Sequence, residues 1–317
     1  LVPNFRNYGA GAFAIEKYNI NKLTLEGGLR YDYRWLRVYQ LNNTSLETYH
    51  TTHDYNNVTG TLGATYKFSN KFSLNFNVGK AWRAPSVNEL YINGIHLSAA
   101  SYEKGDSLLT SEQSYNFTLS ANYESPKFSA ELVGYDNLIN NYIYAKPSLQ
   151  PITLISGTYP YFVYTQANVD LKGFDLDLTY RPFTRWSVES KTSVVRGWNK
   201  TIKDYLIFMP ADRFDNTLKY SIGKWKKFSD LYISLQNITV ARQTRVPPNS
   251  DYVPPPAGYS LLNANLGFAT KLGKKALTID LGASNFTNVA YRDYLNRFRY
   301  YADDIGVSFI LRTKLDF

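Results

Sequence analysis

Two stretches within residues 71–123 place apolar and polar side chains alternately along the chain. The apolar positions of the first stretch are Phe72, Leu74, Phe76, Val78 and Trp82. Those of the second stretch are Tyr115, Phe117, Leu119, Ala121 and Tyr123. A period of two over about ten residues is typical of a β-strand with one apolar and one polar face. Strands of this length and pattern cross a bilayer when they close into a barrel.

The same alternation recurs along the whole sequence and predicts about 13 strands. It is clearest over residues 57–68, where Val58, Leu62 and Tyr66 alternate with threonines. The connections alternate between about two to five residues and about 12 to 30 residues, which is the arrangement of outer-membrane barrels. A soluble β-sandwich does not sort its loops by length in this way. We therefore predict an all-β fold, a transmembrane antiparallel β-barrel.

Departures from the alternation predict where strands bend or end. The phase changes near Gly134 and again around Lys172-Gly173, which indicates β-bulges. Polar residues 51–54 and the segment 83–112 are predicted to be loops. No window approaches about 18 consecutive apolar residues, so no transmembrane helix is predicted.

Composition and charge exclude several classes of function. There is no cysteine, which excludes a disulfide scaffold and a cysteine-based zinc site. The formal net charge is +9, but the basic residues are spread along the chain, so nucleic-acid binding is not indicated. This charge suits a hydrated barrel interior, anionic lipid headgroups or an anionic ligand. The sequence has no nucleophile elbow, phosphate loop or zinc-protease motif, so we do not expect an enzyme.

Aromatic residues make up 16% of the chain and gather where the predicted strands meet loops. Barrels carry such residues in girdles at both membrane interfaces. Lys80 shares the apolar face with Val78, and near the outer interface its amine reaches lipid phosphates at little cost. The predicted girdle residues are Trp82, Tyr123, Tyr180, Trp186 and Phe317.

Short motifs between the two opening stretches resemble those of a known family. They are Trp82-Arg83-Ala84-Pro85-Ser86, Glu89-Leu90-Tyr91, His96, Tyr102-Glu103-x-Gly105-Asp106, Leu108 and Ser111-Glu112-x-Ser114. With Asn285-x-x-Asn288, Tyr291 and the terminal Phe317, the chain resembles TonB-dependent outer-membrane receptors. It departs from the family pattern at Trp82, which stands for phenylalanine, and at 105–108, which stand for Asn-Pro-Asn-Leu.

The resemblance implies a barrel of about 22 strands around an N-terminal plug. Residues 1–317 would then be the C-terminal portion of the outer-membrane β-barrel. About nine strands, the plug and the TonB-contacting segment would lie upstream, and the odd strand count agrees because single-chain bacterial barrels have an even number. The first residues do not resemble a signal peptide. If Phe317 lies on the periplasmic side, the short turns face the periplasm and the long loops face outward.

Residues in the long loops are the candidates for ligand contacts. Arg83 can pair with an anionic ligand, and loop tyrosines can stack on a planar one. In haem receptors of the family, a histidine between the two motifs ligates iron, so for His96 haem, a zinc complex and a plain loop residue all stay open. His50-x-x-His53-Asp54 defines no metal geometry, and no metal site is predicted. The predicted ligand contacts are Arg83, His96, Tyr102, Glu103, Tyr142, Tyr144 and Tyr161.

The resemblance implies a receptor in the Gram-negative outer membrane that binds and imports a scarce nutrient, most often a ferric siderophore complex. The alternatives are a haem or zinc-complex receptor of the same family, a passive porin, and an adhesion or assembly component. The partners it implies are the TonB complex, outer-membrane lipid, a small-molecule metal complex and, in some receptors, a surface lipoprotein. No nucleic acid and no bound cofactor are expected.

Overall fold

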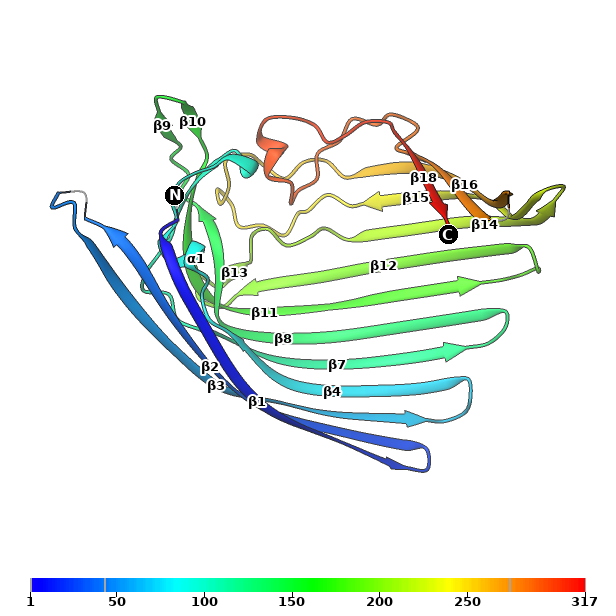
Figure 1. The fold of residues 1–317 in the computed structure, drawn as a ribbon, viewed down its shortest axis with the longest axis horizontal. Coiled ribbons are helices and arrows are strands. Elements are labelled where there is room, and N and C mark those ends of the chain that lie inside the picture. The colour runs from blue at the N-terminus through cyan, green and yellow to red at the C-terminus, as the bar shows by residue number, and fades with distance from the viewer. Residues whose placement is uncertain (1, 43, 274, 317) are drawn as a thin grey trace.

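The computed structural model describes residues 2–42, 44–273 and 275–316. Figure 1 shows one strongly curved sheet of long antiparallel strands, with short turns at one end and long loops at the other. We call these the short-turn end and the long-loop end. In the described part of the chain, the main path of the sheet is β1 (Asn4–Ile20), β2 (Leu23–Leu41), β3 (Thr48–Lys67), β4 (Phe72–Arg83), β7 (Glu112–Glu124), β8 (Phe128–Pro147), β11 (Tyr161–Tyr180), β12 (Trp186–Asn199), β14 (Arg213–Trp225), β15 (Phe228–Val240), β16 (Tyr259–Leu272), β17 (Lys275–Ser284) and β18 (Ser308–Leu315).

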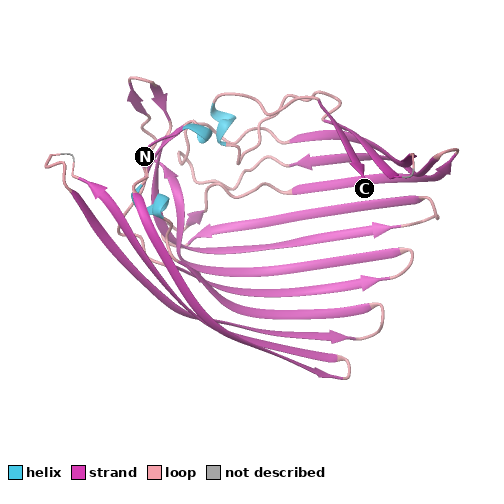
Figure 2. Ribbon diagram, viewed as in Figure 1, coloured by secondary structure: helices cyan, strands magenta, loops and turns pink. Residues whose placement is uncertain are grey.

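Short helices and strands lie at the long-loop end (Figure 2). They are α1 (Val87–Tyr91), β5 (Asn93–His96), the 3-10 helix η1 (Leu97–Ala99), β6 (Ser101–Lys104), β9 (Ile152–Leu154), β10 (Gly157–Tyr159), β13 (Asp204–Tyr205) and the 3-10 helix η2 (Arg297–Tyr300). None of the helices in the described part of the chain is long and apolar enough to span a membrane. The segment predicted as a 30-residue loop therefore contains ordered structure.

The strand register separates an apolar outer face from a polar inner face. Val78 lies opposite Leu62 on β3 and Phe117 on β7, so these three side chains share the outer face. On the inner face, the Asn77 amide donates to the Thr61 hydroxyl at 3.1 Å. Because one face of each strand is apolar and exposed while the other is polar, the sheet has the two-sided character of a membrane barrel wall. The predicted all-β barrel fold is confirmed.

The predicted bulges are wrong in position. Pairing runs without a break through Gly134 to both neighbours and through Gly173 to β12. The apparent phase change arises because Lys172 lies on the outer face, where it pairs with Asp170 at 3.2 Å and Asp136 at 3.5 Å. Charged residues interrupt the apolar pattern there without interrupting the hydrogen bonding.

The actual irregularity between β8 and β11 lies closer to the long-loop end. The register shifts between Ala167 and Val169, opposite an extra residue on β8. Asn141 adopts φ 58° at this point, a left-handed conformation that asparagine tolerates better than most residues. Its backbone N–H donates to the Asn168 side chain at 3.1 Å, so the bulge is held by an asparagine on each strand.

Residues 51–54 belong to β3, so the loop predicted there is wrong. The strand runs from Thr48, and polar side chains are compatible with it because β3 extends past the apolar zone. His50 lies opposite Tyr39 and His53 lies opposite Leu36, which places the two histidines on opposite faces. His53 Nε2 lies 2.6 Å from the Tyr91 hydroxyl instead. The two histidines therefore do not converge on one metal.

Candidate functional site

The mouth is the long-loop end of the sheet together with segments 84–111, 241–258 and 289–306. Segment 84–111 is anchored by α1, which begins with a reciprocal capping box between Ser86 and Glu89. The helix buries Val87 and Leu90 at 6% and 2% exposure. Their apolar partners on other elements are Leu36, Val38, Leu109 and Ile143. Since Leu36 and Val38 belong to β2 and Ile143 to β8, this packing ties the segment to two separate parts of the wall.

Arg83 is held between two carboxylates at the end of β4. Its guanidinium donates to Glu89 at 2.8 Å and also pairs with Glu112. Burial alone would raise the pKa of Glu89, but Arg83 and the capping contacts of Ser86 hold it below its ordinary value. Arg83 thus serves to fix the loop, and its charge is already matched by groups of the protein.

Gly105 lies where the chain passes against the backbone of α1. A Cβ at this position would come within 2.6 Å of the Leu90 carbonyl carbon and the Tyr91 nitrogen. The Gly105 N–H donates to the Ile92 carbonyl at 2.7 Å, and the Asp106 N–H donates to Glu89 at 2.9 Å. Close packing of two backbone segments therefore requires glycine at position 105, which explains why the motif has a glycine there.

Glu103 is the centre of a buried polar cluster in the mouth. Its side chain is 6% exposed and lies on β6. One carboxylate oxygen accepts from Tyr164 at 3.1 Å; the other accepts from Ser101 at 3.4 Å and lies 3.1 Å from His96 Nδ1. His96 is 44% exposed, so its ring is fixed from inside and open to solvent outside. The structure therefore brings two predicted ligand residues into direct contact.

Two further predicted residues lie on β6 and β11, on the faces opposite those of Glu103 and Tyr164. The strand pairs in parallel with β11, with Tyr102 opposite Tyr161. Their ring centroids lie 5.5 Å apart in an edge-on arrangement, and the Tyr102 hydroxyl donates to Asn93 at 2.8 Å. β6 thus places Tyr102 beside Tyr161 on one face, and Glu103 in contact with His96 and Tyr164 on the other.

Tyr142 and Tyr144 lie apart from that group. They stack on each other with centroids 6.1 Å apart, and both pack against a second apolar cluster that contains Leu206. This places them with segment 200–212, whereas Ile143, between them in sequence, packs against Leu90. The predicted tyrosines therefore lie in two separate surroundings, Tyr102 with Tyr161 and Tyr142 with Tyr144.

The mouth also contains a buried ion pair that the sequence did not predict. Arg299, in η2, is 2% exposed and pairs with Asp251. The Tyr300 hydroxyl donates to the same carboxylate at 2.7 Å, and burial together with Asp251 raises the pKa of Tyr300. The Tyr301 hydroxyl then donates to Ala100 at 2.6 Å, which links segment 289–306 to segment 84–111. The aromatic and arginine run at 297–301 is the only sequence signal that points to this cluster.

Arg297 and Phe162 join segment 289–306 to β11. The Arg297 guanidinium lies 3.9 Å from the centre of the Phe162 ring, close enough for a cation–π interaction. Phe162 is fully buried and also contacts the ring of Tyr252. The Tyr252 hydroxyl donates to the Tyr161 carbonyl at 2.9 Å. These contacts hold segments 241–258 and 289–306 against β11.

Asn285 and Asn288, the other motif residues, shape the connection after β17. The Asn285 side chain donates to the Val289 carbonyl and accepts from the Val289 N–H, both at 2.9 Å. The Asn288 side chain accepts from the Val307 N–H at 3.1 Å. Both asparagines have positive φ and hold the loop in place. Among residues 2–42, 44–273 and 275–316, no group of three or more His, Cys, Asp or Glu is placed to hold a metal ion.

Comparison with known families decides the assignment. Residues 2–286 match the family described as TonB dependent receptor-like, beta-barrel. The chain belongs to the TonB-dependent receptor β-barrel family. This confirms the resemblance drawn from the motifs.

Solved structures share the fold of this receptor barrel. The copper transporter OprC has a TM-score of 0.76 and 19% identity, covering 99% of this chain and 48% of that chain. The FrpB iron transporter from Neisseria meningitidis (F3-3 variant) has a TM-score of 0.65 and 16% sequence identity, covering 99% of this chain and 46% of that chain. The ferric yersiniabactin uptake receptor FyuA from Yersinia pestis has a TM-score of 0.66 and 13% sequence identity, covering 99% of this chain and 46% of that chain. The chain therefore spans just under half the length of these proteins.

TonB-dependent receptors are transporters and not enzymes, which confirms that prediction. Barrels of the family lie in the outer membrane, interact with TonB and bind small-molecule metal complexes. The mouth geometry is compatible with ligand capture, because His96 and Glu103 meet there. The individual ligand contacts, the surface lipoprotein and the assignment of residues 1–317 to the C-terminal portion of the barrel stay predictions.

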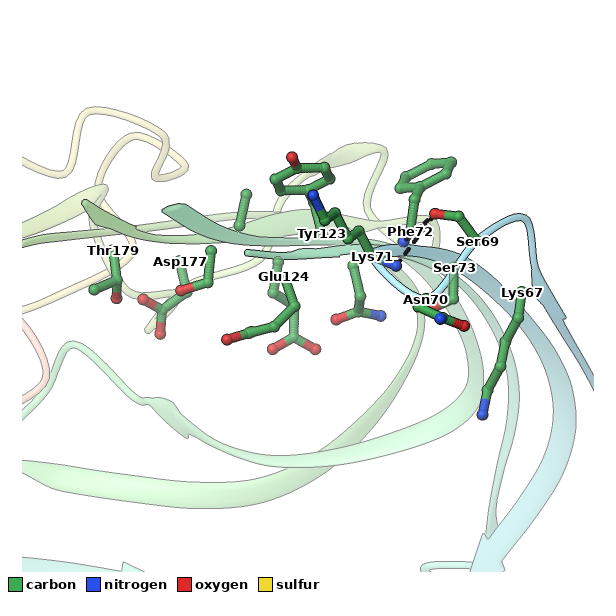
Figure 3. A pocket seen from close by; sticks show the side chains of 14 residues that line it. Lys67, Ser69, Asn70, Lys71, Phe72, Ser73, Tyr123, Glu124, Asp177 and Thr179 are labelled. Carbon is green, nitrogen blue, oxygen red and sulfur yellow. Dashed lines mark hydrogen bonds between the residues drawn. The ribbon is translucent and has the colours of Figure 1, made fainter. Parts of the chain in front are cut away.

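The inner wall of the receptor barrel carries a polar hollow of about 490 Å³ at the short-turn end (Figure 3). Lys67 and Glu124 point into this side of the sheet, whereas Phe72 and Tyr123 point to the other side. Asp177, in the same hollow, pairs with a lysine of β12 at 3.0 Å. In the described part of the chain, neither Lys67 nor Glu124 has an ion-pair partner. The inner wall thus presents fixed charges to a hydrated interior.

Part of the predicted girdle lies where it was expected in the sheet. Tyr123, Tyr180 and Trp186 lie on the outer face at the short-turn end. Trp82 differs, because β4 separates from β3 after Lys80 and the indole lines a polar hollow with Arg30 and Asp32. Phe317 lies outside the described residues. The contact of these side chains with the membrane interface stays a prediction.

Proposed function

We propose that this chain forms wall and mouth of a receptor in the Gram-negative outer membrane that captures a ferric siderophore complex and imports it in a TonB-dependent step. The observation that supports this best is the mouth itself. Packed segments present a half-exposed imidazole whose Nδ1 contacts buried Glu103. The tyrosines around the mouth suit an aromatic ligand.

A haem or zinc-complex receptor is the second candidate, favoured by the geometry at His96. Metal-ligating histidines commonly donate their other ring N–H to a carboxylate, which fixes the ring and raises its basicity. His96 has this arrangement, with Glu103 at 3.1 Å on Nδ1. In the described part of the chain, Nε2 has no hydrogen-bond partner. Nε2 is therefore the atom that would reach a metal.

Uptake by whole cells tests the proposal. Cells that lack the gene should lose accumulation of one ferric complex, and the intact gene should restore it. A protonophore should abolish the restored uptake because the import step is energised. Uptake that continues unchanged with the protonophore would identify a passive porin. Unchanged growth on every iron complex and haem after deletion would reject the iron proposal.

Two substitutions separate the siderophore and the haem or zinc versions. If His96 ligates a metal, Glu103→Gln should weaken binding about 10- to 100-fold, and His96→Ala by at least as much. His50→Ala is the matched control, since that histidine lies on the other side of β3 from the mouth contacts. Unaltered binding of haem and zinc complexes in both mouth variants would reject metal ligation and leave the siderophore version standing.

A further inference from the structure

Several arginines of the mouth are matched by carboxylates of the same chain. Arg245 pairs with Asp212 at 3.0 Å. Arg292 pairs with Asp303 at 2.6 Å. Arg297, in η2, differs from these arginines, because among the described residues its side chain has no ion pair and no hydrogen bond.

Two aromatic rings hold the Arg297 guanidinium in place. Its central carbon lies 3.9 Å from the centre of the Phe162 ring and 5.0 Å from the centre of the Phe208 ring. Phe162 is fully buried and therefore gives the guanidinium a fixed surface. A cation–π contact uses the face of the guanidinium and leaves the N–H groups in its plane free to donate. The rings therefore orient Arg297 without satisfying its hydrogen-bonding groups.

One edge of this guanidinium is buried and another is open. Nη1 is buried and has no hydrogen-bond partner in the part of the chain that the structure describes. The side chain as a whole is only partly buried, and Nε and Nη2 are accessible to solvent. Two adjacent N–H groups of a guanidinium match the two oxygens of a carboxylate and bind them through parallel hydrogen bonds.

The charges around η2 leave a positive excess. Arg299, two residues after Arg297, is 2% exposed and pairs with Asp251. The same carboxylate accepts from the Tyr300 hydroxyl at 2.7 Å, so it is already engaged twice. Two arginines against one carboxylate leave one cation unmatched. Such a charge in a partly buried place favours an anion supplied from outside the described chain.

Arg297 lies within electrostatic reach of the Glu103 cluster. Phe162 and Tyr164 lie on the same face of β11, and Tyr164 packs against the apolar cluster of α1, so this face is turned toward the mouth. Burial and the Glu103 carboxylate raise the pKa of Tyr164, and the charge of Arg297 opposes this rise. A complex bound in the mouth would therefore meet the guanidinium and the Glu103 cluster together.

We propose that Arg297 binds a carboxylate of the imported complex through Nε and Nη2, so that the receptor selects ferric complexes that carry a free carboxylate over those that carry none. This inference rests on the proposed function, because it takes the mouth as the place of capture. It also moves the anion contact away from Arg83, whose charge is matched by Glu89 and Glu112.

Equilibrium binding to the full-length receptor tests this selection. The probes are haem and ferric citrate, which carry carboxylates, and ferrioxamine B, which carries none. The wild type should bind haem or ferric citrate more tightly than ferrioxamine B. Arg297→Gln should weaken that binding about tenfold or more, the contribution of hydrogen bonds between charged groups.

Two further variants separate a direct contact from general attraction and from a structural role. Arg242→Gln is the matched control, because Arg242 is an exposed arginine of segment 241–258 without a partner in the described ranges, and binding should change about twofold or less. Arg297→Lys keeps a cation on the two rings but lacks the adjacent N–H groups of a guanidinium. It should keep the wild-type rate of proteolysis within 289–306 and still lose part of the affinity.

Several results would overturn the proposal. They are no binding of either carboxylate probe, equal affinities in the wild type and both Arg297 variants, equal losses in Arg297→Gln and Arg242→Gln, and preference for ferrioxamine B.

Uptake by whole cells separates this inference from the proposed function. Energised uptake of a ferric complex that is unchanged in Arg297→Gln would overturn the carboxylate contact and leave the proposed function standing. Carboxylate binding that depends on Arg297, without any uptake that a protonophore abolishes, would support the contact and reject the proposed function.

Discussion

Removal of the Leu90 side chain tests whether segment 84–111 is held to the wall by apolar packing. The residue is 2% exposed and packs with Val87 of α1, with β2 and with β8. Leu90→Ala should cost about 2–5 kcal/mol of local stability, because a buried leucine leaves both lost contacts and a cavity. The barrel strands are held by separate hydrogen bonds, so the loss should stay within the mouth.

Hydrogen exchange on the full-length receptor measures this loss. Amides of 87–92 should exchange about 30-fold faster or more, since each 1.4 kcal/mol is a factor of ten. Leu97→Ala is the matched control, because Leu97 is 80% exposed on the same segment and should change exchange little. Unchanged exchange at 87–92, or equal loss of protection in the strands, would refute the packing argument.

Three other changes probe the electrostatics and backbone of the mouth. The pKa of Glu89 in the folded protein lies below its ordinary value of 4.5, so the stabilisation from the ionised carboxylate is complete above pH 4.5 and is lost as the pH falls through the folded-state pKa. Opening of the mouth, followed by tryptophan fluorescence, should therefore increase as the pH falls through this range. Glu89→Gln should remove this transition. Asp251→Asn should cost about 3–5 kcal/mol of local stability, because it leaves Arg299 buried without its charged partner. Asp303→Asn is the control and should cost little, because the Asp303 side chain in its ion pair is 53% exposed. The rate of proteolysis within 289–306 measures both effects. Gly105→Ala should cost about 1–3 kcal/mol by pressing a Cβ on helix backbone, and a wild-type rate of proteolysis at 84–111 would contradict this.

The strands were predictable because their signal is local. Alternation at period two depends on side chains two residues apart, so Val58, Leu62 and Tyr66 identify their strand without knowledge of the rest. The prediction of bulge positions was wrong where ion pairs on the outer face and hydrogen bonds between asparagines interrupted the apolar pattern. Lys172 lies outward in an ion-paired group, which mimics a bulge, and the true bulge depends on paired asparagines that carry no hydrophobic signal.

The mouth was predictable only as a location. The motif residues mark the segment, but the contact between Glu103 and Tyr164 joins positions 61 residues apart, and that between Arg299 and Asp251 joins positions 48 apart. Such pairings follow from how the loops pack and not from their own sequence. The capping box from Ser86 to Glu89 was a local signal for α1, since a serine followed three residues later by glutamate marks a helix start.

The location of the bound metal tests the central claim most directly. Crystals of the full-length receptor with its imported complex bound should give an anomalous scattering peak at the absorption edge of the metal. We predict a peak in the mouth, on the exposed side of His96 and beside the strand that carries Glu103. A saturated complex whose peak lies away from segments 84–111, 241–258 and 289–306 would contradict the account.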